Sequence, residues 1–172
     1  MRTIRRMPRV VLAPVLAVGL CRPGSSLGAG DGKEVSGSLI LDGKTVALEH
    51  AYVDETDADE PIVVLSDKTL PADAIPFIPE KLVKEKAIHA VAFSVSRKDK
   101  RLTNTFGKVY GPGHESGVGL GRVEDERVRL LIQRLDASAI EGSIKTVKPV
   151  ALSFVTYAFD LSFKAPAGKK KA

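Results

Sequence analysis

Three histidines are the residues of this 172-residue chain that are best suited to acid–base or metal chemistry. They are His50, His89 and His114, and an imidazole can take up a proton near neutral pH or bind a metal ion. No two of them have the short spacing by which one helix presents two zinc ligands. A metal-dependent or hydrolytic centre built from these histidines and nearby carboxylates therefore requires the fold to bring them together.

The segment Asp54–Glu60 is rich in carboxylate oxygens, the ligands that calcium prefers. Its candidate ligands are Asp54, Asp57, Asp59 and Glu60. The spacing differs from that of a calcium-binding loop, because the turn has no glycine and no glutamate lies at the distance needed for bidentate binding. An acidic, solvated hairpin loop is the favoured interpretation, and a calcium-stabilised extracellular module is the alternative.

Histidine, acid and serine adjoin in the segment Gly113–Gly117. The nucleophile elbow of hydrolases needs a glycine two positions before and after its serine. Ser116 has His114 and Val118 at those positions, and catalytic triads are built from separate elements of the fold. We therefore interpret Gly111–Gly121 as a flexible loop, and the sequence predicts neither catalytic residues nor a cofactor.

The N-terminal residues form the pattern of a secretory signal. Arginines precede the apolar run Val10–Leu20, and small residues follow at 28–30. This run is shorter than the roughly 20 residues that span a bilayer, so no membrane segment is expected after processing. A lipoprotein signal with Cys21 as the lipidated residue is less favoured, because Leu20 stands where a small residue is wanted. Residues 1–30 are thus predicted to direct export to the periplasm or the extracellular space.

The positive charge of the chain lies mainly in this signal. The sequence has 26 basic and 21 acidic residues. The first 30 residues hold five arginines and no acid, so 21 residues of each sign remain after them. Nucleic-acid binding needs a concentrated basic surface, and the remaining chain does not predict one. Residues 165–172 contain three lysines and are expected to be a disordered basic tail.

Alternation of apolar and polar residues predicts that the chain from 34 to 164 is one β-rich domain. The alternation is clearest in Tyr157–Phe163, and Asp42-Gly43 is typical of a tight hairpin turn. The other predicted strands are Val35–Leu41, Lys44–Val53, Ile62–Leu65, Ile88–Ser96, Leu102–Tyr110, Val128–Leu135 and Ala139–Thr146. Val128–Leu135 also fits a helix, although the strand is favoured.

One short helix is expected between Pro71 and Lys86, with Pro79 at its start. The chain is long enough to bury a core without disulfides. Together these elements predict an all-β fold, an antiparallel β-sandwich or flattened barrel of about seven to nine strands.

The runs Gly37–Lys44 and Ile62–Lys68, with Tyr157, Phe159-Asp160-Leu161 and Phe163 near the end, resemble an uncharacterised family of small secreted bacterial β-rich proteins. The resemblance covers most of the chain after residue 34. It consists of strand and turn signatures, so it implies fold and export and gives no activity to carry over.

The function predicted from these patterns is that of an exported, non-catalytic domain that binds or scaffolds a protein or cell-surface partner. Strand edges and the two loops, Asp54–Glu60 and Gly111–Gly121, are the expected contact surfaces. The histidine-based enzyme and the calcium-stabilised module are the alternatives.

Overall fold

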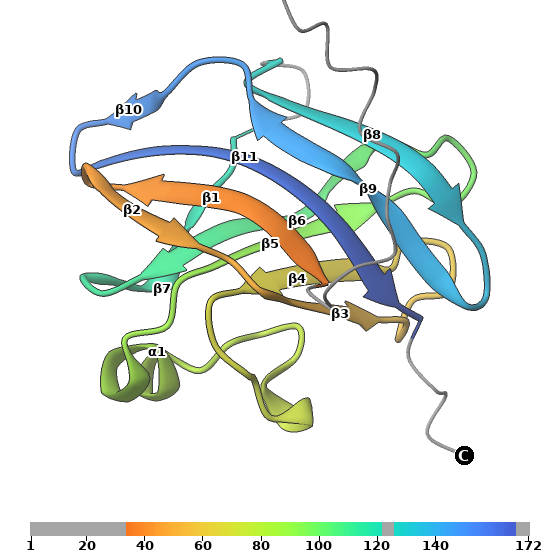
Figure 1. The fold of residues 1–172 in the computed structure, drawn as a ribbon, viewed down its shortest axis with the longest axis horizontal. Helices are drawn as coiled ribbons and strands as arrows, with labels where there is room; N and C mark the ends of the chain where they lie inside the picture. Colours follow the sequence, from red (N-terminus) through yellow and green to blue (C-terminus); the bar gives the residue numbers. More distant parts are fainter. Residues whose placement is uncertain (1–33, 122–125, 168–172) are drawn as a thin grey trace, which may run out of the picture. The chain divides into compact units, whose positions relative to one another are not determined.

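The computed structural model describes residues 34–121 and 126–167. The predicted signal, the lipidation alternative at Cys21 and the lysines of the predicted tail lie outside these residues. The described chain forms two antiparallel sheets that pack face to face (Figure 1). None of its helices is long and apolar enough to cross a membrane.

Each sheet has a simple order of neighbouring strands. The first sheet runs β2 (Lys44–Ala47), β1 (Val35–Leu41), β11 (Val155–Pro166), β9 (Ala139–Thr146) and β8 (Val128–Leu135), with β10 (Val150–Leu152) also paired to β11. The second sheet runs β3 (His50–Asp54), β4 (Ile62–Ser66), β5 (Ala90–Val95), β6 (Leu102–Gly111) and β7 (His114–Gly119). In the described chain, β8 thus lies at one edge of the first sheet.

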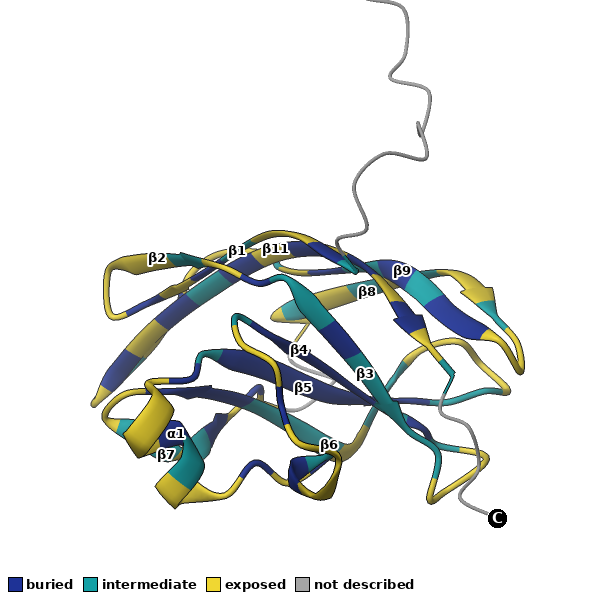
Figure 2. Cartoon of the chain, turned by 60° about the horizontal axis from the view of Figure 1, so that its bottom comes forward, coloured by how far each residue is buried: buried dark blue, intermediate teal, exposed yellow. Residues whose placement is uncertain are grey.

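Alternate residues of the two sheets form the main core. β11 is buried at every second position, and Leu161 there is fully enclosed. Phe93 of the second sheet meets Phe163 of the first at 5.6 Å between ring centres. Figure 2 shows buried residues alternating with more exposed ones along strands of the sandwich. Burial of this apolar surface is the main stabilising contribution to the fold.

A smaller apolar cluster covers the outer face of the second sheet. The helix α1 (Glu80–Lys86) and the 3-10 turn η1 (Ala72–Ala74) lie on this side. Val83 and Ile88 are fully buried there against residues such as Tyr110. α1 begins directly after Pro79 and ends at Ala87, whose left-handed backbone closes the helix. The second sheet is therefore buried on both faces.

The structure confirms the all-β antiparallel sandwich with one short helix. Two separate sheets are present, so the flattened-barrel alternative is wrong. Seven of the eight predicted strands are found at or near their expected residues, and the ambiguous Val128–Leu135 is a strand. Asp42 and Gly43 both have positive φ, as the tight hairpin turn requires. The described chain has 11 strands, more than the seven to nine expected.

The single strand predicted over Lys44–Val53 is wrong, because the chain leaves one sheet for the other at Leu48-Glu49. Val46 on β2 lies opposite the buried Leu39 and so shares its core-facing side, whereas Ala51 faces the core from β3. The interval between them is odd, so one continuous strand could not point both side chains inward.

The flexible loop predicted over Gly111–Gly121 is also wrong, because its residues 114–119 form β7. These glycine-rich residues have little tendency to form a strand by themselves, and they are held in one by pairing with β6. At the other boundary, Ala165 and Pro166 belong to β11 and pair with β9, although the sequence assigned them to the tail.

Candidate functional site

A cleft lies where β8 of the first sheet passes β6 of the second. Two cavities, of about 260 Å³ and 510 Å³, share the side chains of Leu102 and Val128. The smaller extends along β6 to the end of β7, and the larger extends along β8. Clefts with apolar walls and a few polar groups are the usual form of a ligand site.

A bulge in β6 shapes the smaller cavity. Between Val95↔Leu102 and Phe93↔Gly107, β6 has more residues than β5, so part of β6 leaves the ladder. The buried side chain of Ser94 holds this segment: its Oγ accepts the Phe106 N–H at 3.0 Å, donates to the Phe106 carbonyl at 3.1 Å and also bonds the Thr103 hydroxyl. The bulge therefore turns Thr103 and Phe106 into the wall of the cavity.

The wall of the larger cavity comes from both faces of β8. Val128, Leu130 and Ile132 are half-buried and pack against the core, while Arg129 and Leu131 face outward. Leu131 is 62% exposed. The cavity thus wraps around the edge of the first sheet rather than entering its core.

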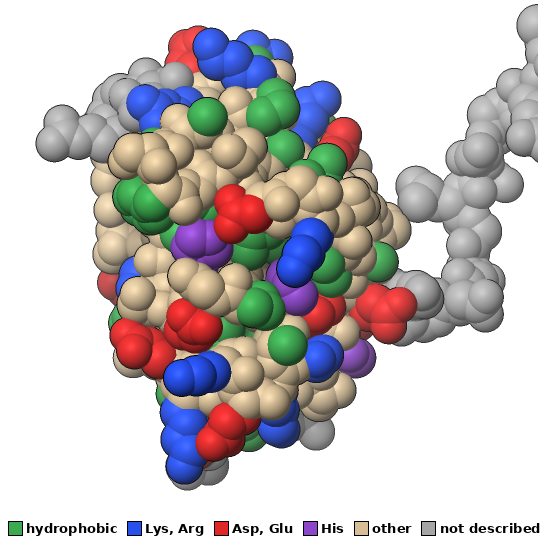
Figure 3. All heavy atoms as spheres, turned by 90° about the vertical axis from the view of Figure 1, so that its left-hand side faces the viewer, with side chains coloured by type: hydrophobic (Ala, Val, Ile, Leu, Met, Phe, Trp, Pro, Cys, Tyr) green, Lys and Arg blue, Asp and Glu red, His purple; other side chains and the backbone are tan. Residues whose placement is uncertain are grey.

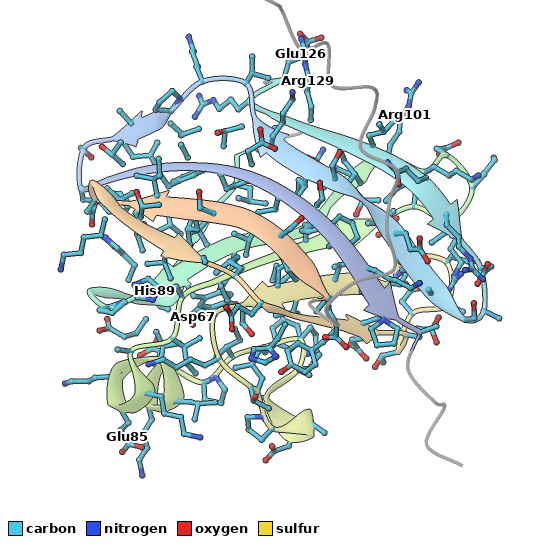
Figure 4. All side chains as sticks on the ribbon, viewed as in Figure 1. Asp67, Glu85, His89, Arg101, Glu126 and Arg129 are labelled. Atoms are coloured by element: carbon cyan, nitrogen blue, oxygen red, sulfur yellow. The ribbon has the colours of Figure 1, made fainter. Side chains whose placement is uncertain are left out.

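Three cations stand at the rim of this apolar wall, namely Arg101, Arg129 and Lys145. Arg129 and Lys145 are neighbours across the β8–β9 ladder. Across residues 34–121 and 126–167, no carboxylate is ion-paired with any of the three, although Asp160 on β11 lies opposite Lys145. Figure 4 shows Arg101 and Arg129 on the β8 side of the domain, with Glu126 close to Arg129. The rim is therefore positively charged and available to an anion.

His89 belongs to a different place, the end of the second sheet where β4 gives way to Asp67. Its ring Nδ1 lies 3.0 Å from a carboxylate oxygen of Asp67, and its backbone N–H donates to the other oxygen at 2.8 Å. Asp67 in turn donates its backbone N–H to the His89 carbonyl. The labelled pair is visible in Figure 4. These bonds join the end of β4 to the start of β5.

His114 makes a second pair, which connects the two sheets. Its Nε2 lies 2.7 Å from the carboxylate of Asp42 in the β1–β2 turn. The other oxygen of Asp42 accepts the backbone N–H of Thr156 at 2.9 Å. The Thr156 N–H, followed by the His114 ring, lowers the pKa of Asp42 below its usual value. Figure 3 shows this end of the domain, where histidines lie among acidic and apolar side chains.

His50 does not join either pair. It is opposite Ser66, on the outer face of the second sheet. His89 lies one residue before Ala90, which is opposite Ser66, so the alternation along the strand directs His89 toward the other face. Among the described residues, no three His, Cys, Asp or Glu side chains are placed to share a metal ion. No serine hydroxyl in that part of the chain bonds the ring of His89 or His114. Within the described residues, His89 and His114 thus each lie beside one aspartate, without the cluster of metal ligands that the alternative, a histidine-based metal enzyme, would need.

The acidic residues of Asp54–Glu60 bind neighbouring groups of the protein. Asp54 accepts bonds from the backbone and hydroxyl of Thr56, and Asp57 accepts the N–H groups of Asp59 and Glu60. Glu60 accepts a hydrogen bond from the Thr105 hydroxyl. The segment is a loop, as predicted, whose carboxylates stabilise its own turns. Calcium binding by this loop stays a prediction.

Sequence reasoning predicted the strands of the cleft but did not single out its residues. One sequence signal of the cleft was present, an apolar residue, Leu131, on the otherwise polar face of Val128–Leu135. The same residue explains why this segment also fitted a helix. The β6 bulge has no such local signal, because it depends on Ser94 of the neighbouring strand.

Comparison of the chain with protein-family models, with curated proteins and with solved structures found no match.

Proposed function

We propose that this protein is an exported, non-catalytic binding module and that the cleft between β6 and β8 holds its ligand. The ligand that suits this cleft carries an anionic group next to an apolar part. The observation that supports the proposal is the combination of an apolar wall, at Leu102, Val128 and Leu130, with three cations at its rim.

The charge of the rim favours an anion for a physical reason. Among the described residues these three cations form no ion pair, and a cation that is not held in an ion pair attracts and orients charged ligands from solvent. The apolar wall adds affinity by removing the uncharged part of the ligand from water. The two His–Asp pairs do not compete as a ligand site, because each histidine is already used in a bond that connects strands or sheets.

Titration with the anionic dye anilinonaphthalene sulfonate tests the proposed cleft, because the dye fluoresces when its rings leave water. We expect saturable binding that weakens as salt is added, since exposed charges are screened. Arg129→Glu should weaken binding by about tenfold, because it places a negative charge where the sulfonate is held.

Lys81→Glu provides the matched control. It makes the same change in net charge at an exposed site on α1, which packs on the second sheet, away from β8. Dye binding that does not saturate, or that both substitutions weaken equally, would contradict the proposal.

Export is tested separately by mass spectrometry of the exported fraction of a bacterial host. The proposal expects a chain that has lost approximately its first 30 residues. An intact chain confined to the cytoplasm would contradict it.

A further inference from the structure

The edge of β8 carries backbone groups that its own sheet does not use. Val147 donates its N–H to the Arg127 carbonyl at 2.9 Å, next to the β8–β9 ladder. Hydrogen-bonded pairs alternate along an antiparallel ladder, so Arg129 and Leu131 also bond toward β9. The N–H and C=O groups of Val128 and Leu130 therefore point away from β9, toward the cleft.

The facing strand does not close this edge in the described chain. β7 pairs with β6 only from Gly107 onward, where Leu120 donates its N–H to the Gly107 carbonyl, so the ladder between β6 and β7 does not extend along the bulged beginning of β6. The cavities that share Leu102 and Val128 occupy the space between the two edges. An extended chain beside β8 could bond the N–H and C=O groups of Val128 and Leu130 and could place its apolar side chains against the wall of the cleft.

The side chains of β8 define what such a chain must carry. A residue opposite Leu130 would share its face and point into the apolar cleft. A residue opposite Arg129 would point outward, into the row where Arg129 and Lys145 lie side by side. Charge complementarity therefore selects a carboxylate at that outward position, with apolar residues on either side of it.

We propose that β8 binds an extended, acidic segment of a partner polypeptide as an added strand of the first sheet. This inference rests on the proposed function and names its ligand. A second copy of this chain fits less well, because pairing the whole of β8 with itself in antiparallel register would place Arg129 opposite Arg134, and cross-strand like charges are destabilising. Charges on an edge strand oppose such self-association.

The test uses a fluorescent peptide about as long as β8 that alternates valine with threonine and has one glutamate at a central threonine position. We expect fluorescence anisotropy to show saturable binding to the full protein. Replacing the glutamate by lysine should weaken binding by about tenfold, and Arg129→Glu should restore the lysine peptide while weakening the glutamate peptide. Lys145→Glu provides a second charge reversal in the same row, and Lys81→Glu is the control.

Two N-methylated peptides test the backbone pairing. An antiparallel added strand directs its valine N–H groups at β8, and a parallel one directs its threonine N–H groups there. One of the two methylation patterns should therefore weaken binding by about tenfold while the other leaves it unchanged. The methylation pattern that weakens binding shows whether the added strand is antiparallel or parallel to β8.

Three results would overturn the inference: no peptide binding, equal binding of the glutamate and lysine peptides, or no sensitivity to either methylation pattern. If the dye still binds and Arg129→Glu still weakens it, the cleft takes a compact anionic ligand, and only the added strand is disproved. If neither dye nor peptide binds, the proposed function fails as well.

Discussion

Ser94 is a buried polar side chain that supports the candidate site, because its hydroxyl satisfies the backbone of the β6 bulge at Phe106. Ser94→Ala would leave the Phe106 N–H without this acceptor in a site closed to water. We expect a loss of about 1–3 kcal/mol in the free energy of unfolding, measured by urea denaturation. Dye binding should weaken too, because the bulge shapes the smaller cavity.

Ser162→Ala is the matched control for Ser94→Ala. Ser162 is exposed on β11, and the same loss of a hydroxyl there should change the stability by less than about 0.5 kcal/mol. Equal effects of the two substitutions would show that the hydroxyl of Ser94 has no special role.

Asp42 gives the fold a pH dependence whose sign follows from its hydrogen bonds. The Thr156 N–H and the His114 ring lower the pKa of Asp42 in the folded state. Stability from this carboxylate is therefore present above its unfolded pKa, near 3.9, and is lost as the pH falls through the lower folded value. The difference in unfolding free energy between the wild type and Asp42→Asn should be constant near neutral pH and shrink below about pH 4.

Urea denaturation at several pH values checks this prediction, and the difference between the two proteins removes the effect of other carboxyl groups. A difference that grows as the pH falls would contradict the depressed pKa of Asp42.

The elements of the fold were largely predictable where local pattern and tertiary structure agree. β1 and β9 have the predicted bounds, since their alternation matches burial on one face. The change of sheet between β2 and β3 was also encoded, in the odd interval from Val46 to Ala51, but reading it requires knowing that both face the core. β7 was not predictable, because only Val118 of its residues is buried.

The candidate site was predictable only in part, for a related reason. The sequence pointed to strand edges and to histidines, acids and glycines, which are recognisable one by one. The cleft depends on which strands end a sheet and on the bulge opposite Ser94, and both are properties of pairing between distant segments.

Gly37 offers a test of how closely two strands of the first sheet approach. It has φ of +113°, and a Cβ there would lie 2.0 Å from the carbonyl oxygen of Asp160 on β11. Gly37→Ala should therefore cost at least about 2 kcal/mol of unfolding free energy, measured by thermal or urea denaturation. Gly43 also has a positive φ, but a Cβ there would have no atom within 4 Å. Gly43→Ala should therefore lower the unfolding free energy only by the backbone strain, about 1–2 kcal/mol. A Gly43 variant less stable than the Gly37 variant would contradict this account.

At the scale of the whole domain, contact between the sheets should appear as energetic coupling between aromatic side chains. Phe93 and Phe163 come from different sheets, are nearly or fully buried and meet edge to face. A double-mutant cycle with Phe→Leu at both positions should give a coupling of about 0.5–1.5 kcal/mol.

The exposed pair Phe77–Phe106 provides the comparison for this cycle. Its ring centres are as close, at 5.2 Å, but Phe77 is 66% exposed. Its coupling should be smaller, because water replaces part of the contact. Equal coupling in the two cycles would show that burial between the sheets does not strengthen the contact.

The pairing of the first strand with the last has a consequence for how the protein is made. β1 lies between β2 and β11, and its residue Val35 pairs with Phe163. This pair cannot form until Phe163, near the end of the chain, has been synthesised. While the ribosome is still adding residues, the centre of the first sheet cannot assemble, because β11 also joins β1 to β9. Such distant pairing makes folding slow. The first sheet therefore cannot be completed until β11 has been synthesised, whereas β3 to β7, all the strands of the second sheet, are available earlier.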